Sequence, residues 1–208
     1  KYAVLMIGGK CRVMTEKEDT LGELRRNRIE LIPFEDFRNF TMNRLVTATS
    51  ARGQETRVPI GDWWLTQPGR RQYEELVFAP ACETPGAYNM WRGFAVSPKP
   101  GMEKIKRYLE HVQENVCLGN SEHYDYLIRW MARAVQRPGE PGQTAIVLRG
   151  KQGTGKNRFA EMFGNLFGRH FLSVHDSNHL FGQFVLHLRD CCVLLANEAF
   201  WAGNKKQE

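Results

Sequence analysis

The sequence has 208 residues, of which 42% are hydrophobic and 11% aromatic, so it belongs to the globular class and not to disordered or collagen-like chains. Its longest apolar runs, residues 2–7 and 191–196, are far shorter than the ~18–20 residues of a membrane-spanning helix. We therefore expect no membrane span. Because the first residues carry no small-residue cleavage site of a signal peptide, we also expect a cytoplasmic location. The net charge of +6 suits a polyanionic partner such as nucleic acid, but the basic residues are spread along the chain.

The first half of the chain predicts a small α+β region. Two strand-like runs flank Gly8-Gly9-Lys10, which is a typical signal of a β-hairpin. A further strand is expected at residues 29–34. Residues 62–73 favour a helix with Asp62 as its N-cap, interrupted by Pro68-Gly69.

The pattern changes to helical spacing from residue 102 onward. Apolar residues within 105–116 and 123–136 recur as on one face of a helix, and residues 119–121 separate the two runs. The Pro- and Gly-rich residues 137–143 form the clearest boundary in the sequence. Five cysteines without CxxC spacing predict reduced thiols and not a disulfide or zinc framework.

The strongest motif lies at residues 150–157, GKQGTGKN, which match the phosphate-loop pattern GxxxxGK. The apolar run 144–148 predicts a buried strand before the loop, and the residues after it have helical spacing. Phosphate oxygens need backbone N–H groups and a helix N-terminus, which a glycine-rich loop can provide. The loop residues expected to bind nucleotide are Gly150, Lys151, Gln152, Gly153, Thr154, Gly155, Lys156 and Asn157.

The last two residues of the loop, Lys156 and Asn157, are expected to contact the phosphates and Mg²⁺, respectively. Lys156 is expected to bring its charge to the β- and γ-phosphates. Asn157 stands where the motif normally has Ser or Thr, whose hydroxyl binds Mg²⁺. A carboxamide oxygen can ligate a hard cation, but Asn is bulkier, so weak Mg²⁺ binding is expected here.

A second candidate element is the apolar run 191–196, followed by Asn197 and Glu198. Nucleotide hydrolases place an Asp for the metal and a Glu that polarises the attacking water at the end of such a strand. Asn197 occupies the metal position, and Glu198 occupies the base position. The sequence therefore predicts a site that keeps Lys156 and Glu198 but has weakened metal coordination.

Four stretches, residues 88–96, 111–120, 126–157 and 180–208, resemble the superfamily 3 helicase part of phage and plasmid primase-helicases, relatives of the poxvirus-type primase-helicase. The resemblance covers most of residues 60–208. It implies an AAA+-like ATPase that uses ATP and Mg²⁺ and forms a homo-oligomeric ring, a hexamer. Such a ring moves on single-stranded or forked DNA and unwinds the duplex at a phage or mobile-element replication fork. The resemblance also implies a primase module or partner, and the host cytoplasm if the protein is phage-encoded.

The resemblance assigns catalysis to Lys156 and Glu198 and weak Mg²⁺ binding to Asn157 and Asn197. The expected fold is α/β, with a P-loop (AAA+-like) ATPase core that is incomplete at its C-terminus, so the chain is expected to be a fragment. The expected parts are residues 1–100 as an α+β accessory or linker region, 101–142 as a helical segment, and 143–208 as the partial ATPase core.

Other interpretations of the same residues stay open. The two Asn substitutions also fit a degenerate nucleotide-binding module that scaffolds a replication complex without hydrolysis, and the loop alone would fit a metabolite kinase. Base stacking and zinc binding are weaker alternatives. They concern Trp63, Trp64, Tyr88, Trp91 and Trp130 for stacking, and His170, His175, His179 and His187 for zinc.

Overall fold

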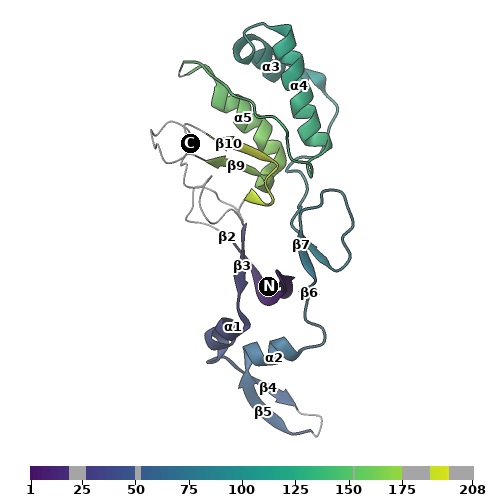
Figure 1. The fold of residues 1–208 in the computed structure, drawn as a ribbon, viewed down its shortest axis with the longest axis vertical. Helices are drawn as coiled ribbons and strands as arrows, with labels where there is room; N and C mark the ends of the chain where they lie inside the picture. Colours follow the sequence, from purple (N-terminus) through teal and green to yellow (C-terminus); the bar gives the residue numbers. More distant parts are fainter. Residues whose placement is uncertain (19–26, 50–52, 152, 175–187, 197–208) are drawn as a thin grey trace. The chain divides into compact units, whose positions relative to one another are not determined.

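The computed structural model describes residues 1–18, 27–49, 53–151, 153–174 and 188–196 (Figure 1). The fold is mixed α/β with small sheets, as the sequence predicts at that level. Its contacts divide the chain into two units, residues 1–90 and 91–208. The second unit contains both the helical segment and the segment predicted to be catalytic, and the functional division between those segments stays a prediction.

The first unit is organised by a sheet in the order β3-β2-β1-β6. The strands are β1 (Tyr2–Ile7), β2 (Lys10–Glu18), β3 (Asn27–Ile32) and β6 (Gln72–Tyr73). β1 and β2 form the predicted hairpin, whose turn residues Gly8 and Gly9 both have positive φ, 54° and 72°. Those φ values fit the hairpin turn that Gly-Gly favours.

The sheet of the first unit is covered on both faces, because alternate residues of β1 enter different cores. Ala3 and Leu5 pack with Met14, Leu76 and Met90 on one side. Val4 packs with Val13, Phe37 and Leu65 on the other side. This distribution follows from the two-residue period of a β-strand.

The remaining elements of the first unit are short. They are α1 (Phe34–Thr41), β4 (Leu45–Thr49), β5 (Glu55–Pro59), α2 (Ile60–Thr66), β7 (Glu75–Val77) and β8 (Ala87–Asn89). The prediction of Asp62 as a helix N-cap is wrong, since α2 begins at Ile60 and Pro59 holds the N-cap position. The fixed φ of proline suits the start of a helix, so the N-cap lies three residues earlier than predicted.

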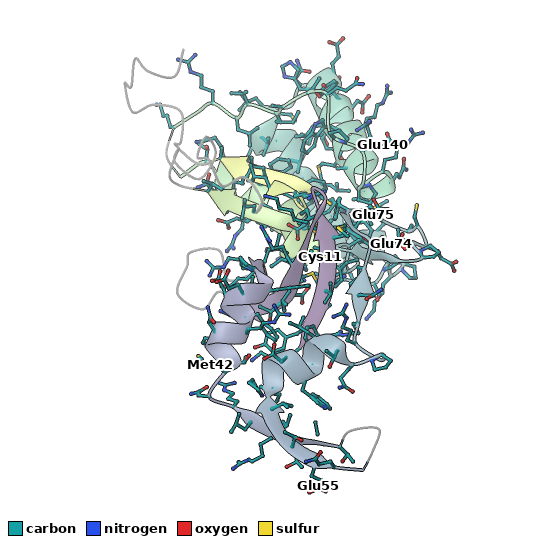
Figure 2. All side chains as sticks on the ribbon, turned by 60° about the horizontal axis from the view of Figure 1, so that its bottom comes forward. Cys11, Met42, Glu55, Glu74, Glu75 and Glu140 are labelled. Carbon is teal, nitrogen blue, oxygen red and sulfur yellow. The ribbon has the colours of Figure 1, made fainter. Side chains whose placement is uncertain are left out.

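The second unit begins with the two predicted helices. α3 (Met102–His111) continues into a π-helical turn, η1 (Val112–Val116), and α4 spans Ser121–Gln136. The Asn120 side chain caps α4 by accepting a hydrogen bond from the backbone N–H of His123 at 2.9 Å. At the other end of α4, Glu140, labelled in Figure 2, accepts hydrogen bonds from Arg133 and Arg137.

The rest of the second unit consists of α5 (Lys156–Gly164), the 3₁₀ turn η2 (Asn165–His170), β9 (Phe171–Val174) and β10 (Val193–Ala196). β9 and β10 are parallel, with Val193 opposite Phe171 and Ala196 opposite Val174. Phe159 of α5 belongs to a core shared with η1 and α4, whereas Phe163 packs with Val193. α5 therefore lies between the helices and the strand pair.

The prediction of a strand at residues 144–148 is wrong, because this segment forms no strand in the structure. The segment alternates as a strand does: Ile146 and Leu148 pack against the helical core, while Val147 is 86% exposed. However, it joins neither β9 nor β10, and a β-strand is defined by hydrogen bonds to a neighbour. The apolar alternation correctly indicates which side chains pack against the core. It does not indicate that the segment has no neighbouring strand with which to pair.

Among the described residues, none of the helices has the length and apolar character needed to cross a membrane. All five cysteines are among the described residues, and none of them is paired in a disulfide.

Candidate functional site

The loop between Arg149 and α5 is built around two glycines with left-handed backbone. Gly153 has φ 82° and Gly155 has φ 80°, a conformation that glycine adopts without the steric cost of a Cβ atom. Gly150 does not have a positive φ, and a Cβ there would meet Thr154 Oγ1 only at 3.8 Å. The backbone therefore explains glycine at 153 and 155, but it does not require glycine at 150 in this conformation.

Lys156, the first residue of α5, turns its side chain back over this loop. Its ammonium nitrogen Nζ donates to the carbonyl oxygens of Lys151 (2.7 Å) and Gly150 (2.9 Å) and to Thr154 Oγ1 (3.2 Å). The Thr154 hydroxyl itself donates to the Lys151 carbonyl at 3.0 Å. A lysine ammonium has three N–H donors, so three loop oxygens satisfy it completely.

Gly155 occupies the N-cap position of α5, and its carbonyl accepts the first helical hydrogen bond, from Phe159 N–H at 3.0 Å. The next residues, Asn157 and Arg158, are exposed. The first N–H groups of a helix have no intrahelical acceptor and carry a partial positive charge, so this end of α5 favours an anion. The exposed Asn157 contributes one carboxamide oxygen at the same end.

The strand pair lies beside α5, and Figure 1 shows the arrows of β9 and β10 pointing toward the side from which α5 starts. In α/β structures, ligands bind outside the carboxyl ends of parallel strands. Ala196, the last residue of β10, is followed directly by Asn197 and Glu198. Those two residues, and Gln152 in the loop, lie outside the described residues.

Two side chains of α3 contact the loop and α5, and neither was found by sequence reasoning. His111 Nε2 lies 3.3 Å from the Gly155 carbonyl oxygen. Tyr108 stacks on Phe159, with ring centroids 6.1 Å apart, and its hydroxyl donates to the Phe159 carbonyl. Burial raises the pKa of Tyr108, so the phenol keeps the proton that it donates. The nearest sequence signal is the pair His111 and Asn115, one helical turn apart.

His170, Trp91 and Trp130, which were considered for zinc binding or base stacking, make contacts within the protein, whereas Trp63 is 37% exposed. His170 is fully buried: its Nε2 accepts from Arg92 N–H at 3.0 Å, and its Nδ1 lies 2.7 Å from the Asp190 carbonyl. Both ring nitrogens are thus engaged by the protein. Trp91 stacks on His170 at 4.6 Å, and Trp130 donates to the Thr144 carbonyl. His175, His179 and His187 lie outside the described residues.

Three comparisons with known proteins bear on this region. A family model described as "Family of unknown function (DUF5906)" matches residues 148–208, which begin just before the loop and contain α5, β9 and β10. No curated protein gives a significant match to the sequence.

The third comparison finds a similar solved structure, "The apo structure of NrS-1 C terminal region (305-718)". It aligns with 94% of this chain at a TM-score of 0.54 and 18% sequence identity. The alignment covers 42% of that structure, so this chain spans less than half of its length. At this identity, the likeness concerns the fold alone.

Proposed function

We propose that this chain carries the nucleotide-binding part of an ATP-dependent DNA helicase of the superfamily 3 type. The observation that carries the proposal is the position of Lys156, whose ammonium group is held over a glycine-rich loop at the N-terminus of α5. A P-loop core built from residues 143–208 accounts for this arrangement. The parallel pairing of β9 with β10 beside α5 supports it.

Phosphate binding would use charges that the loop already holds in place. Phosphate oxygens would replace the Gly150, Lys151 and Thr154 oxygens as acceptors for Lys156. The free N–H groups at the start of α5 would bind the same phosphates, because backbone amides and the helix dipole both favour an anion there. No large rearrangement of α5 is needed for this exchange of partners.

Mg²⁺ fits the oxygen donor at Asn157, although a single carboxamide is a weak ligand. When bound, the ion would neutralise phosphate charge. Asn197 is the second proposed weak ligand, and Glu198 is the proposed general base that polarises the attacking water. Within a complete protein, we propose a hexameric ring that acts on single-stranded or forked DNA together with a primase module, in phage or mobile-element replication.

Titration of a fluorescent ATP analogue tests the nucleotide site directly. We expect micromolar binding by the full chain and a loss of at least about tenfold in Lys156→Ala, because a charge-assisted hydrogen bond is removed. Lys106→Ala is the matched control, since Lys106 is an exposed lysine of α3 and the substitution changes the charge equally. Equal binding by Lys156→Ala and Lys106→Ala would contradict the proposal.

The same titration without Mg²⁺ separates the hydrolase from the degenerate module. Binding that strengthens with Mg²⁺ supports the ATPase, and hydrolysis should then be measured with single-stranded DNA. Binding that depends on Lys156 but is indifferent to Mg²⁺ supports the module without hydrolysis, which the Asn residues at 157 and 197 favour.

A further inference from the structure

His111 contacts the phosphate loop from a different helix. Its imidazole is so close to Gly155 that an added Cβ there would lie 2.5 Å from Cε1 and 2.9 Å from Nε2 of the ring. Real Cβ atoms do not approach other atoms so closely, so the absence of a side chain at 155 makes room for this ring. Glycine at 155 is therefore required both by its positive φ and by His111.

The hydrogen bonds of the ring indicate which tautomer the neutral imidazole adopts. The Asn115 amide nitrogen Nδ2 lies 3.2 Å from His111 Nδ1, and an amide nitrogen can only donate. The Gly155 carbonyl oxygen, 3.3 Å from Nε2, can only accept, so Nε2 carries the proton, and in the neutral ring Nδ1 accepts from Asn115.

The Gly155 carbonyl thus accepts two hydrogen bonds, one from His111 Nε2 and one from Phe159 N–H. A carbonyl oxygen has two lone pairs and can accept both. The second of these bonds is the first of α5, so the imidazole acts on the residue where the loop becomes a helix. The orientation of that residue also sets the direction of the following N–H groups, which the phosphate site needs.

The ring itself is held by the backbone around it. His111 is the last residue of α3, and the π-turn η1 begins at the next residue, Val112. Val112 is fully buried in one core with Phe159 and Leu127. The same turn carries Asn115, the partner of the imidazole.

We propose that His111, in its neutral form with the proton on Nε2, is a positioning residue of the phosphate loop. It holds the Gly155 carbonyl, and with it the first turn of α5, in the orientation that binds phosphate. Asn115 keeps the ring in the required tautomer. The expected effect of His111 on nucleotide affinity rests on the proposed function. Its effect on the conformation of the ligand-free loop does not.

The first test uses the ligand-free chain. Long-range ¹H–¹⁵N NMR spectra should show the Nε2–H tautomer of His111. Hydrogen exchange of the Phe159 amide should accelerate by about tenfold in His111→Leu, since one hydrogen bond to its acceptor is lost. His111→Gln, whose amide nitrogen can replace Nε2 as a donor, should stay within about threefold of the wild type. His123→Leu, which alters an exposed histidine of α4, should change nothing.

Asn115→Ala tests the same role of His111 without changing the partly buried imidazole, so the test does not depend on whether His111→Leu folds. Asn115→Ala removes an exposed side chain, and it should shift the His111 tautomer toward Nδ1–H and accelerate exchange at Phe159. An Nδ1–H tautomer in the wild type, or unchanged Phe159 exchange in both His111→Leu and Asn115→Ala, would overturn the proposal whether or not nucleotide binds.

The last arm measures affinity for the fluorescent ATP analogue. We expect about tenfold weaker binding in His111→Leu and near-complete rescue in His111→Gln. Wild-type affinity in His111→Leu, with Lys156→Ala inactive, would overturn the positioning role alone. If the wild type does not bind nucleotide at all, the proposed function fails, and the ligand-free measurements still decide the role of His111.

Discussion

Gly155 and the imidazole ring of His111 are in direct contact, although 44 positions separate them in the sequence. The contact joins the end of α3 to the start of α5, the two elements that meet at the candidate loop. It makes the loop sensitive to any side chain added at Gly155, which leads to the first prediction.

Gly155→Ala should destabilise the chain more than Gly153→Ala does. Both substitutions place alanine at a left-handed φ, at a cost of about 1–2 kcal/mol each. At Gly153 no atom lies within 4 Å of the new Cβ, whereas at Gly155 the His111 ring must also move. We expect Gly155→Ala to cost about 1–3 kcal/mol more, as overpacking does. Urea unfolding of the two variants measures this difference, and equal costs would contradict the described contact.

Gly164→Ala tests the packing between α5 and β9. A Cβ at Gly164 would lie 2.3 Å from the Phe171 ring, so the ring or the helix must shift, and we expect a loss of about 1–3 kcal/mol. Gly69→Ala is the control, because an added Cβ there meets nothing within 4 Å and its φ is not positive. Thermal unfolding that lowers the melting temperature of both variants equally would be inconsistent with this packing.

Local signals in the sequence were sufficient for much of the fold. The hairpin of β1 and β2 follows from Gly8-Gly9 between alternating runs, and α4 follows from its helical periodicity, although its cap at Asn120 was not predicted. α1 was not assigned, because its eight residues are too few for a clear period. The parallel pairing of β1 with β6 joins Val4 to Gln72, and no local pattern indicates a partner so far along the chain.

Only the part of the candidate site that is contiguous in sequence could be predicted, because local patterns do not indicate contacts between distant residues. The loop and Lys156 are contiguous in sequence, so one motif identifies both. His111 reaches the loop only through the packing of α3 and η1 against α5, and a histidine on a helix surface is usually solvated. The run 144–148 has the alternation of a strand, but pairing depends on a neighbour that the pattern does not contain.

His170 is expected to be essential for the stability of the second unit. Its ring connects Arg92 N–H to the Asp190 carbonyl, and it stacks on Trp91. His170→Leu removes both hydrogen bonds inside a buried region, which should cost about 2–4 kcal/mol. Unfolding followed by tryptophan fluorescence measures this loss. His123→Leu, at an exposed position, should leave stability nearly unchanged, and a similar effect of both variants would refute the assignment.

Removing the N-cap of α4 should lower the free energy of unfolding less than the loss of His170 does. Asn120→Ala removes the side-chain acceptor for His123 N–H and should cost about 1 kcal/mol. Ser121→Ala, at the next and exposed position, should change stability by less than half of that value. Chemical denaturation of both variants compares them, and an Asn120→Ala variant as stable as the wild type would argue against the cap.

The thiols should differ in their reactivity. Burial raises the pKa of Cys192 to about 12, with smaller contributions from Cys191 and Asp190. Only the thiolate reacts with alkylating agents, so a raised pKa leaves Cys192 protonated and slow at pH 8. Cys11, labelled in Figure 2, and Cys82 are exposed and should be alkylated first. Mass spectrometry of the iodoacetamide-treated native chain reports the order, and early labelling of Cys192 would disagree with its burial.

Site-resolved NMR tests most directly whether the loop before α5 binds the phosphates of a nucleotide. Backbone amide resonances of Gly153, Gly155 and Lys156 should shift when a slowly hydrolysed ATP analogue is added with Mg²⁺, and Lys156→Ala should suppress these shifts. The exposed control Lys106→Ala should retain them. Shifts confined to other parts of the chain, or none in a folded protein at millimolar nucleotide, would contradict a phosphate site at this loop.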